Sequence, residues 1–197
     1  EQLPAVRMYG NIRQGRIRAF LAEVERRLRD QSPFYEAVSL PSSLEIEHIM
    51  PQGWRTHWDT EPPLGPEDAA RRDRLVNTIG NLTLTTKSLN ASLSNRPWTD
   101  QAAQGLKDGG AVGQGKRRLL EQFSLLVLNK QILQHEDAWT DEDIVRRAHQ
   151  IVDDLCQVWP GPDVEAQASA REALHSDAQQ PAVPDQTSLP EVPWTAD

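Results

Sequence analysis

The stretch "SLEIEHIMPQGW" (residues 43–54) alternates apolar and polar side chains and then reaches a proline. Alternation of this kind is typical of a β-strand with one buried face. Pro51 predicts the end of the strand, because proline has no backbone N–H for strand pairing. Successive side chains of a strand point to opposite faces, so Glu47 and His48 should face different sides. A carboxylate that holds a cation beside an imidazole that takes a proton from water would explain the pair, but a structural or surface role fits it as well.

A second stretch, "TIGNLTLTTKSLNASLSN" (residues 78–95), supplies a partner for the first. Gly80 and Asn81 are a turn signal, the alternating leucines and threonines after them predict a short strand, and the residues that follow have helical spacing. If the two strands pair, the amide oxygen of Asn90 should approach Glu47. Because Mg²⁺ prefers oxygen ligands and keeps several waters, two such protein oxygens with phosphate oxygens and water would satisfy it.

Helical periodicity dominates the rest of the chain. Amphipathic helices are predicted over residues 10–31, 66–78, 116–133 and 140–158. In the last of these, Thr140 and Asp143 have the spacing of a capping box. The predicted fold is therefore α+β, mostly α, with a short two-stranded hairpin surrounded by helices. We expect one domain over residues 1–160, a flexible Gly-rich insertion at 105–115, and an acidic, Pro- and Ala-rich C-terminal tail over 161–197.

Composition narrows the class of protein. The chain has 197 residues, of which 38% are hydrophobic, enough for one domain with a buried core. Cys156 is the only cysteine, which excludes a disulfide framework and a Cys-rich zinc site. No apolar run approaches the roughly 18 residues of a membrane span, and no leader-like segment is apparent. We therefore expect a soluble, cytoplasmic protein with no membrane partner.

The net charge of −8 would argue against a nucleic-acid partner, but the acidity is uneven. Residues 1–130 carry 18 Lys and Arg against 15 Asp and Glu, a balance of +3. Residues 131–197 carry 3 against 14, a balance of −11. Since a phosphate responds to charges within a Debye length of about 8–10 Å, a DNA-binding surface on the first two-thirds of the chain remains open.

The motifs "EHIMPQ" and "IGNLTLTTKSLNASLSNRPW", in this order, resemble the HNH (ββα-metal) nucleases. Within that group they are most similar to the His-Xaa-Xaa-Pro branch, which forms the C-terminal nuclease domain of GmrSD-type and SspE-type modification-dependent restriction endonucleases. The later stretches "KRRLLEQFSLLVLNKQI" and "WTDEDIVRRAHQIVDDLCQVWP" resemble the helical remainder of that branch. The resemblance covers about residues 15–160 and leaves the tail outside it.

The resemblance implies a role for each motif residue. His48 matches the general base that activates water for attack on a backbone phosphate. Glu47, where many relatives have Asp, and Asn90, where the founding motif has His, match metal ligands, and the implied cofactor is Mg²⁺, for which Mn²⁺ can substitute. Asn81 matches the central asparagine, which supports the hairpin and helps to orient the base, so we assign it to the catalytic group with His48.

Contacts to the substrate are expected from basic and polar side chains near the motif. The basic residue that the family places soon after "NRPW" is missing from "WTDQAAQ", and Lys116 is its counterpart if the Gly-rich insertion has displaced it. Phosphate contacts position a duplex without reading its sequence. The candidates for substrate binding are Lys87, Asn95, Arg96, Lys116 and Arg117, although a solvated charged face explains such residues equally well.

The resemblance implies a divalent-metal-dependent DNA endonuclease, the effector domain of a restriction or anti-phage defence protein, which either nicks DNA or cuts both strands. Its expected partners are DNA and a ParB-like nucleotide-hydrolysing sensor domain N-terminal to it in the same protein. Two other classes stay open. One is a catalytically silent HNH-like module for DNA binding or partner interaction, which the overall acidity favours. The other is a toxin-like nuclease that acts on RNA.

Overall fold

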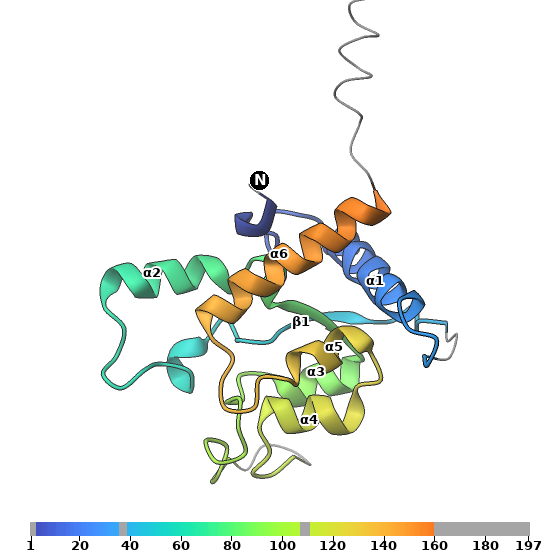
Figure 1. Cartoon of the computed structure of the whole chain (residues 1–197). Helices are drawn as coiled ribbons and strands as arrows, with labels where there is room; N and C mark the ends of the chain where they lie inside the picture. Colours follow the sequence, from blue (N-terminus) through green and yellow to red (C-terminus); the bar gives the residue numbers. More distant parts are fainter. Residues whose placement is uncertain (1–2, 36–38, 107–110, 160–197) are drawn as a thin grey trace, which may run out of the picture. The chain divides into compact units, whose positions relative to one another are not determined.

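The computed structural model describes residues 3–35, 39–106 and 111–159, and these residues form six α-helices, three short 3₁₀ helices and two strands (Figure 1). In chain order the elements are η1 (Leu3–Ala5), α1 (Gln14–Asp30), β1 (Glu45–His48), η2 (Trp54–Thr56), α2 (Pro66–Leu75), η3 (Ile79–Asn81), β2 (Leu82–Thr85), α3 (Lys87–Leu93), α4 (Lys116–Phe123), α5 (Val127–Ile132) and α6 (Asp141–Val158). The mostly α, α+β class predicted from the sequence is confirmed. Among the described helices, none is long and apolar enough to cross a membrane.

The two strands pair antiparallel and form a two-stranded sheet. In their register Glu45 lies opposite Thr85, and His48 lies opposite Leu82. The predicted hairpin is thus confirmed. α3 follows β2 directly, and the Thr86 hydroxyl caps the first turn of that helix by accepting a hydrogen bond from the Leu89 N–H.

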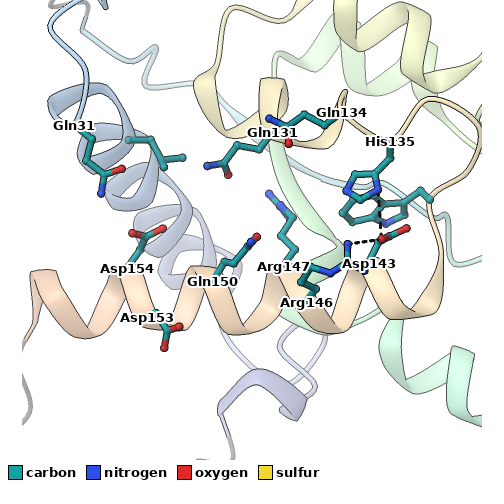
Figure 2. A pocket seen from close by; sticks show the side chains of 12 residues that line it. Gln31, Gln131, Gln134, His135, Asp143, Arg146, Arg147, Gln150, Asp153 and Asp154 are labelled. Atoms are coloured by element: carbon teal, nitrogen blue, oxygen red, sulfur yellow. Dashed lines mark hydrogen bonds and ion pairs between the residues drawn. The ribbon is translucent and has the colours of Figure 1, made fainter.

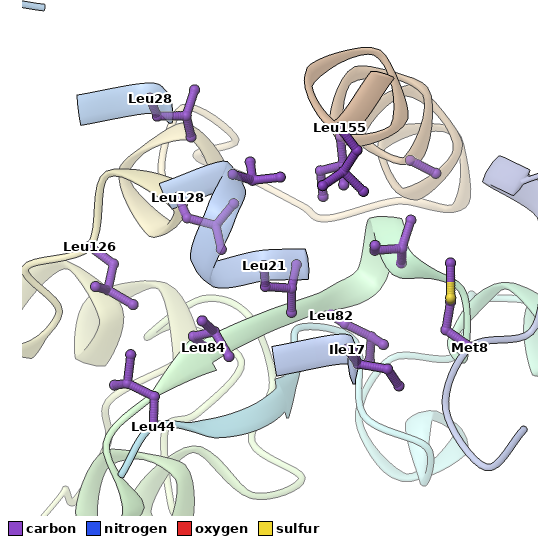
Figure 3. Packing of buried hydrophobic residues seen from close by; sticks show 14 of the residues in the cluster. Met8, Ile17, Leu21, Leu28, Leu44, Leu82, Leu84, Leu126, Leu128 and Leu155 are labelled. Carbon is purple, nitrogen blue, oxygen red and sulfur yellow. The ribbon is translucent and has the colours of Figure 1, made fainter. Parts of the chain in front are cut away.

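One hydrophobic core lies where α1 and α6 pack over β2 (Figure 3). α1 contributes Ile17, Leu21, Val24 and Leu28 at helical spacing, all buried. β2 contributes Leu82 and Leu84, Met8 comes from the N-terminal segment, and α6 contributes Ala148, Ile151 and Leu155. Each buried Leu, Ile, Val or Met side chain contributes about 1.5–3 kcal/mol when it leaves water, so this core holds the two long helices against the strand that follows Asn81.

A second core lies under the loop that follows β1. It is built around three tryptophans, Trp54, Trp98 and Trp139, which are 1%, 4% and 3% exposed. Their ring nitrogens do not stay unpaired: Trp54 donates to Asp73, and Trp98 donates to the His135 carbonyl. These tryptophans are packed inside the protein, so they cannot stack on the bases of a nucleic acid.

The helix predicted over residues 116–133 is two helices, α4 and α5, separated by extended backbone at Ser124 and Leu126. The cause lies in α1, where Glu25 is fully buried. Its carboxylate accepts hydrogen bonds from the N–H groups of Val127 and Leu128, at 3.0 and 2.7 Å. A carboxylate that binds these free N–H groups stabilises the start of a new helix at this point.

α6 begins with the predicted capping box: the Thr140 hydroxyl accepts from the Asp143 N–H, and the Asp143 carboxylate accepts from the Thr140 N–H. The helix then packs against η3. The two approach so closely at Gly80 that a Cβ there would lie 2.0 Å from the Ile144 carbonyl oxygen. Residues 107–110 of the expected Gly-rich insertion, and the whole of the expected tail at 161–197, lie outside the described residues.

Candidate active site

His48 is the last residue of β1, and its imidazole is largely buried. The Tyr9 ring packs edge-to-face on it, with 4.5 Å between the ring centroids, and Asn77 hydrogen-bonds to it. Its Nε2 atom is buried and has no hydrogen-bond partner among the described residues. Burial, and next the positive charge of Lys116, lower the pKa of His48 from 6.5 to about 4, although the Asn77 hydrogen bond opposes the shift. The imidazole is therefore neutral at physiological pH and has a free acceptor nitrogen.

Glu47 lies on the opposite face of the strand, as the alternation predicts. The side chain is 7% exposed, and one carboxylate oxygen lies 2.5 Å from Nζ of Lys116, the first residue of α4. The same ammonium group donates to the His48 carbonyl oxygen at 2.7 Å. Burial raises the pKa of Glu47 and lowers the pKa of Lys116, and the attraction between the two charges opposes both shifts. Lys116 thus joins the two motif residues of β1 through one buried nitrogen.

Asn90 lies on α3, the helix that directly follows β2. Its amide nitrogen donates to a carboxylate oxygen of Glu45 at 3.1 Å and to the Ile46 carbonyl at 3.2 Å. Because Glu45 and Glu47 are two residues apart, they share the strand face that α3 covers. Glu45 is therefore a further acidic side chain at the site. The spacing of two residues between Glu45 and Glu47 indicates a shared strand face, so Glu45 could have been predicted from the sequence, but it was not among the predicted site residues.

The side chains on this face fit a hard divalent cation in their chemistry. The oxygens come from the carboxylates of Glu45 and Glu47 and from the amide of Asn90, and such ligands suit Mg²⁺. One oxygen of the Glu47 carboxylate already pairs with the Lys116 ammonium, so a divalent ion would have to bind the other oxygen or displace this pair. Within the described residues, no three His, Cys, Asp or Glu side chains converge so that they could hold a metal ion. A divalent ion here would therefore depend on the Asn90 amide and on oxygens outside the protein.

Asn81 is fully buried, and every hydrogen-bonding group of its side chain has a partner. The amide oxygen accepts from the Met50 N–H at 2.9 Å and from the Trp139 ring N–H at 3.2 Å. The amide nitrogen donates to the carbonyls of Met50 and Val76, at 2.7 and 2.9 Å. Its backbone carbonyl also accepts from the Ile49 N–H at 3.0 Å. Asn81 thus fixes the turn directly after His48, which makes it a positioning residue.

Arg147 in α6 supports the same turn and was not singled out in the sequence. One guanidinium nitrogen donates to the carbonyls of Gly80 and Leu82, at 2.7 and 2.8 Å, on either side of Asn81. Burial lowers the pKa of Arg147 to about 9. Figure 2 shows the side chain beside Gln131, in a pocket of about 630 Å³ lined by residues of α1, α5 and α6. That pocket does not include His48.

The five expected substrate contacts divide into two groups. Lys87 and Asn95 are exposed. Arg96 and Lys116 are 4% and 1% exposed, and Arg96 donates to the carbonyls of Ser92 and Gln114. Arg117 is half-buried and donates to the Leu133 carbonyl at 3.2 and 3.3 Å. In this arrangement the nitrogens of Arg96, Lys116 and Arg117 bind groups of the protein, and their contact with DNA stays a prediction.

Comparison with known protein families gives a match. A family model described as GmrSD restriction endonucleases, C-terminal domain, matches residues 6–154, which include both strands, α3 and most of α6. No curated protein and no solved structure matches the chain.

Proposed function

The chain belongs to the family of GmrSD restriction endonuclease C-terminal domains, and we propose that it is an HNH-type DNA endonuclease that hydrolyses phosphodiester bonds with His48 as its general base. The observation that carries this proposal is the state of His48. Its imidazole is neutral, because its pKa is lowered to about 4, and one buried nitrogen has no partner among the described residues. A general base needs such a free lone pair to take a proton from water.

The surroundings of His48 serve to hold that base in place. Asn81 fixes the turn after it, Tyr9 packs on its ring and Asn77 hydrogen-bonds to it. Lys116 holds its carbonyl oxygen. A base whose ring is fixed on several sides loses little freedom when the substrate arrives, and such positioning accounts for much of the rate in hydrolytic enzymes.

Glu47 and Asn90 would hold a divalent cation, with Glu45 beside them, and Mg²⁺ is the ion that their oxygens suit best, with Mn²⁺ as a substitute. When bound, the ion would neutralise charge on the phosphate that is cleaved. In this proposal Lys116 keeps Glu47 facing α3 and α4, and the exposed side chains of Lys87 and Asn95 contact the DNA.

As an effector domain in restriction or anti-phage defence, this unit would act in the cytoplasm, where foreign DNA enters. A ParB-like nucleotide-hydrolysing sensor domain N-terminal to it would select the DNA, and the domain itself would nick one strand or cut both. The second candidate function is a silent DNA-binding or partner-interaction module. It is favoured by one observation, the ion pair of 2.5 Å between Glu47 and Lys116, which already neutralises the carboxylate.

Cleavage of a supercoiled plasmid by the purified protein with Mg²⁺ or Mn²⁺ tests the proposal. We expect relaxed or linear DNA, and no cleavage with EDTA or in His48→Ala. A matched control is His149→Ala, since His149 is exposed on α6 and its loss should leave cleavage unchanged. Intact plasmid with measurable DNA binding by the folded protein would favour the silent module, and degradation of RNA alone would favour the toxin-like class.

A further inference from the structure

The segment before α1 lies against the candidate base. The N–H groups of Met8 and Tyr9 both donate to the Asn77 carbonyl, at 2.9 and 3.1 Å. Arg7 forms an isolated antiparallel bridge with Thr78. These bonds place the Tyr9 ring on the His48 imidazole, 4.5 Å between centroids. The N-terminal segment therefore forms one wall beside His48.

This segment and the start of α1 carry only positive charge. Residues 3–22 contain four arginines and no Lys, Asp or Glu. Arg7, Arg13 and Arg16 are exposed, and we call these three residues the basic N-terminal surface. Tyr9 connects this part of the chain to the site. Arg7 donates to the Tyr9 carbonyl at 3.4 Å, and Gln14, next to Arg13 in the sequence, donates to the Tyr9 hydroxyl at 3.2 Å. Arg13 and Arg16 lie within one helical turn of Gln14.

The second half of α1 shows how this helix treats its other arginines. Arg26, Arg27 and Arg29, in the second half of the helix, each pair with a carboxylate: Arg26 with Glu23 at 2.6 Å, Arg27 with Asp154 at 2.9 Å and Arg29 with Glu25 at 2.7 Å. Within the described residues, no ion pair joins any member of the basic N-terminal surface to an acid. The charge of the basic N-terminal surface thus has no acidic partner among the described residues, whereas Arg26, Arg27 and Arg29 farther along α1 are paired.

We propose that the basic N-terminal surface binds backbone phosphates of the DNA strand next to the phosphate that His48 attacks. The inference rests on the proposed nuclease function and names the substrate contacts that the motif did not supply. Of the five contacts expected from the sequence, Arg96, Lys116 and Arg117 donate to groups of the protein itself. Arginine is suited to the role, because its planar guanidinium binds phosphate through two parallel hydrogen bonds. Such contacts set the position of the duplex and carry no sequence preference.

The test compares two triple variants that lose the same charge. The first is Arg7→Gln, Arg13→Gln and Arg16→Gln. The control is Arg26→Gln, Arg71→Gln and Arg146→Gln, whose side chains are 58%, 46% and 60% exposed and pair with acids. Binding of a labelled duplex is measured in EDTA over a series of salt concentrations, so that cleavage does not enter the result. Thermal unfolding of both variants checks that each is folded.

Each phosphate contact contributes about 0.9 to the slope of log K against log salt concentration. We therefore expect the first variant to lose up to about 2.7 of that slope and to bind more weakly at low salt, while the control keeps the slope of the wild type. Equal slopes in the first variant and the wild type, or an equal loss in the control, would overturn the inference.

The same samples with Mg²⁺ separate this inference from the proposed function. If the first variant binds and cleaves DNA as well as the wild type does, the basic N-terminal surface does not bind the substrate, and the proposed nuclease function stands. If the wild type binds DNA through these arginines but does not cleave it, the result supports phosphate binding by the basic N-terminal surface and contradicts the proposed nuclease function. No salt-dependent binding by the wild type contradicts the inference directly.

Discussion

Substitution of Asn81 by alanine tests how the turn beside the base is held. The change removes four hydrogen bonds: two with Met50 and one each with Val76 and Trp139. At about 1 kcal/mol for each net bond, the free energy of unfolding should fall by about 4 kcal/mol. A domain of this size has about 5–15 kcal/mol in total, so Asn81→Ala should retain about 1–11 kcal/mol and stay folded at 25 °C.

Urea unfolding followed by tryptophan fluorescence measures this effect, since Trp54 and Trp139 are buried in the core beneath the turn. The midpoint should fall while the slope stays constant, because the same surface is exposed on unfolding. Asn95→Ala is the matched control: its side chain is exposed, so we expect a change within about 0.5 kcal/mol. A loss of less than about 1 kcal/mol in Asn81→Ala would mean that the four bonds do not hold the turn.

Three further predictions follow from the buried charges. Glu25→Ala should cost about 3–5 kcal/mol, because it leaves Arg29 without its partner and the start of α5 without its acceptor, and urea unfolding measures it. Burial raises the pKa of Asp143, but hydrogen bonds from Thr140 and the charges of His135 and Arg146 outweigh it and lower that pKa below 3.8. The pKa of Asp143 is therefore lower in the folded state than in the unfolded state, so the ionised carboxylate stabilises the fold at pH 7 and this stabilisation is lost as the pH falls below 3.8. Asp143→Asn should thus be less stable than the wild type at pH 7, and the difference should shrink at low pH. Unfolding of both proteins at pH 7 and pH 3 measures this difference. Since the pKa of His48 is lowered to about 4, single-turnover cleavage should show no acid limb near 6.5, and an acid limb there would contradict a buried, neutral His48.

The sequence predicted the parts of the fold that depend on neighbouring residues. The hairpin, the amphipathic face of α1 and the capping box at Thr140 all rest on short-range patterns, and all are present. The end of α4 was not predicted, because its cause, Glu25, lies about a hundred residues earlier in the chain. Periodicity alone continued the helix across that break.

The candidate site divides in the same way. The alternation of β1 correctly placed Glu47 and His48 on opposite faces, but it gave no sign that Lys116 would pair with Glu47 from the first turn of another helix. Nor could it show that Arg147 supports the turn at Asn81, because an arginine on a helix with an apolar face usually looks like a solvated residue. Contacts between distant segments decide which polar residues are buried, and short-range patterns of the sequence do not contain that information.

Chemical rescue is the most direct test of the claim that His48 is the general base. His48→Gly removes the imidazole, and cleavage of a labelled duplex is then followed with increasing concentrations of free imidazole in the presence of Mg²⁺. We expect imidazole to restore cleavage in His48→Gly, and more basic imidazoles to restore it more. His149→Gly, which alters an exposed histidine, should cleave without added imidazole. Cleavage by His48→Gly at the rate of the wild type, without added imidazole, would show that His48 is not the general base.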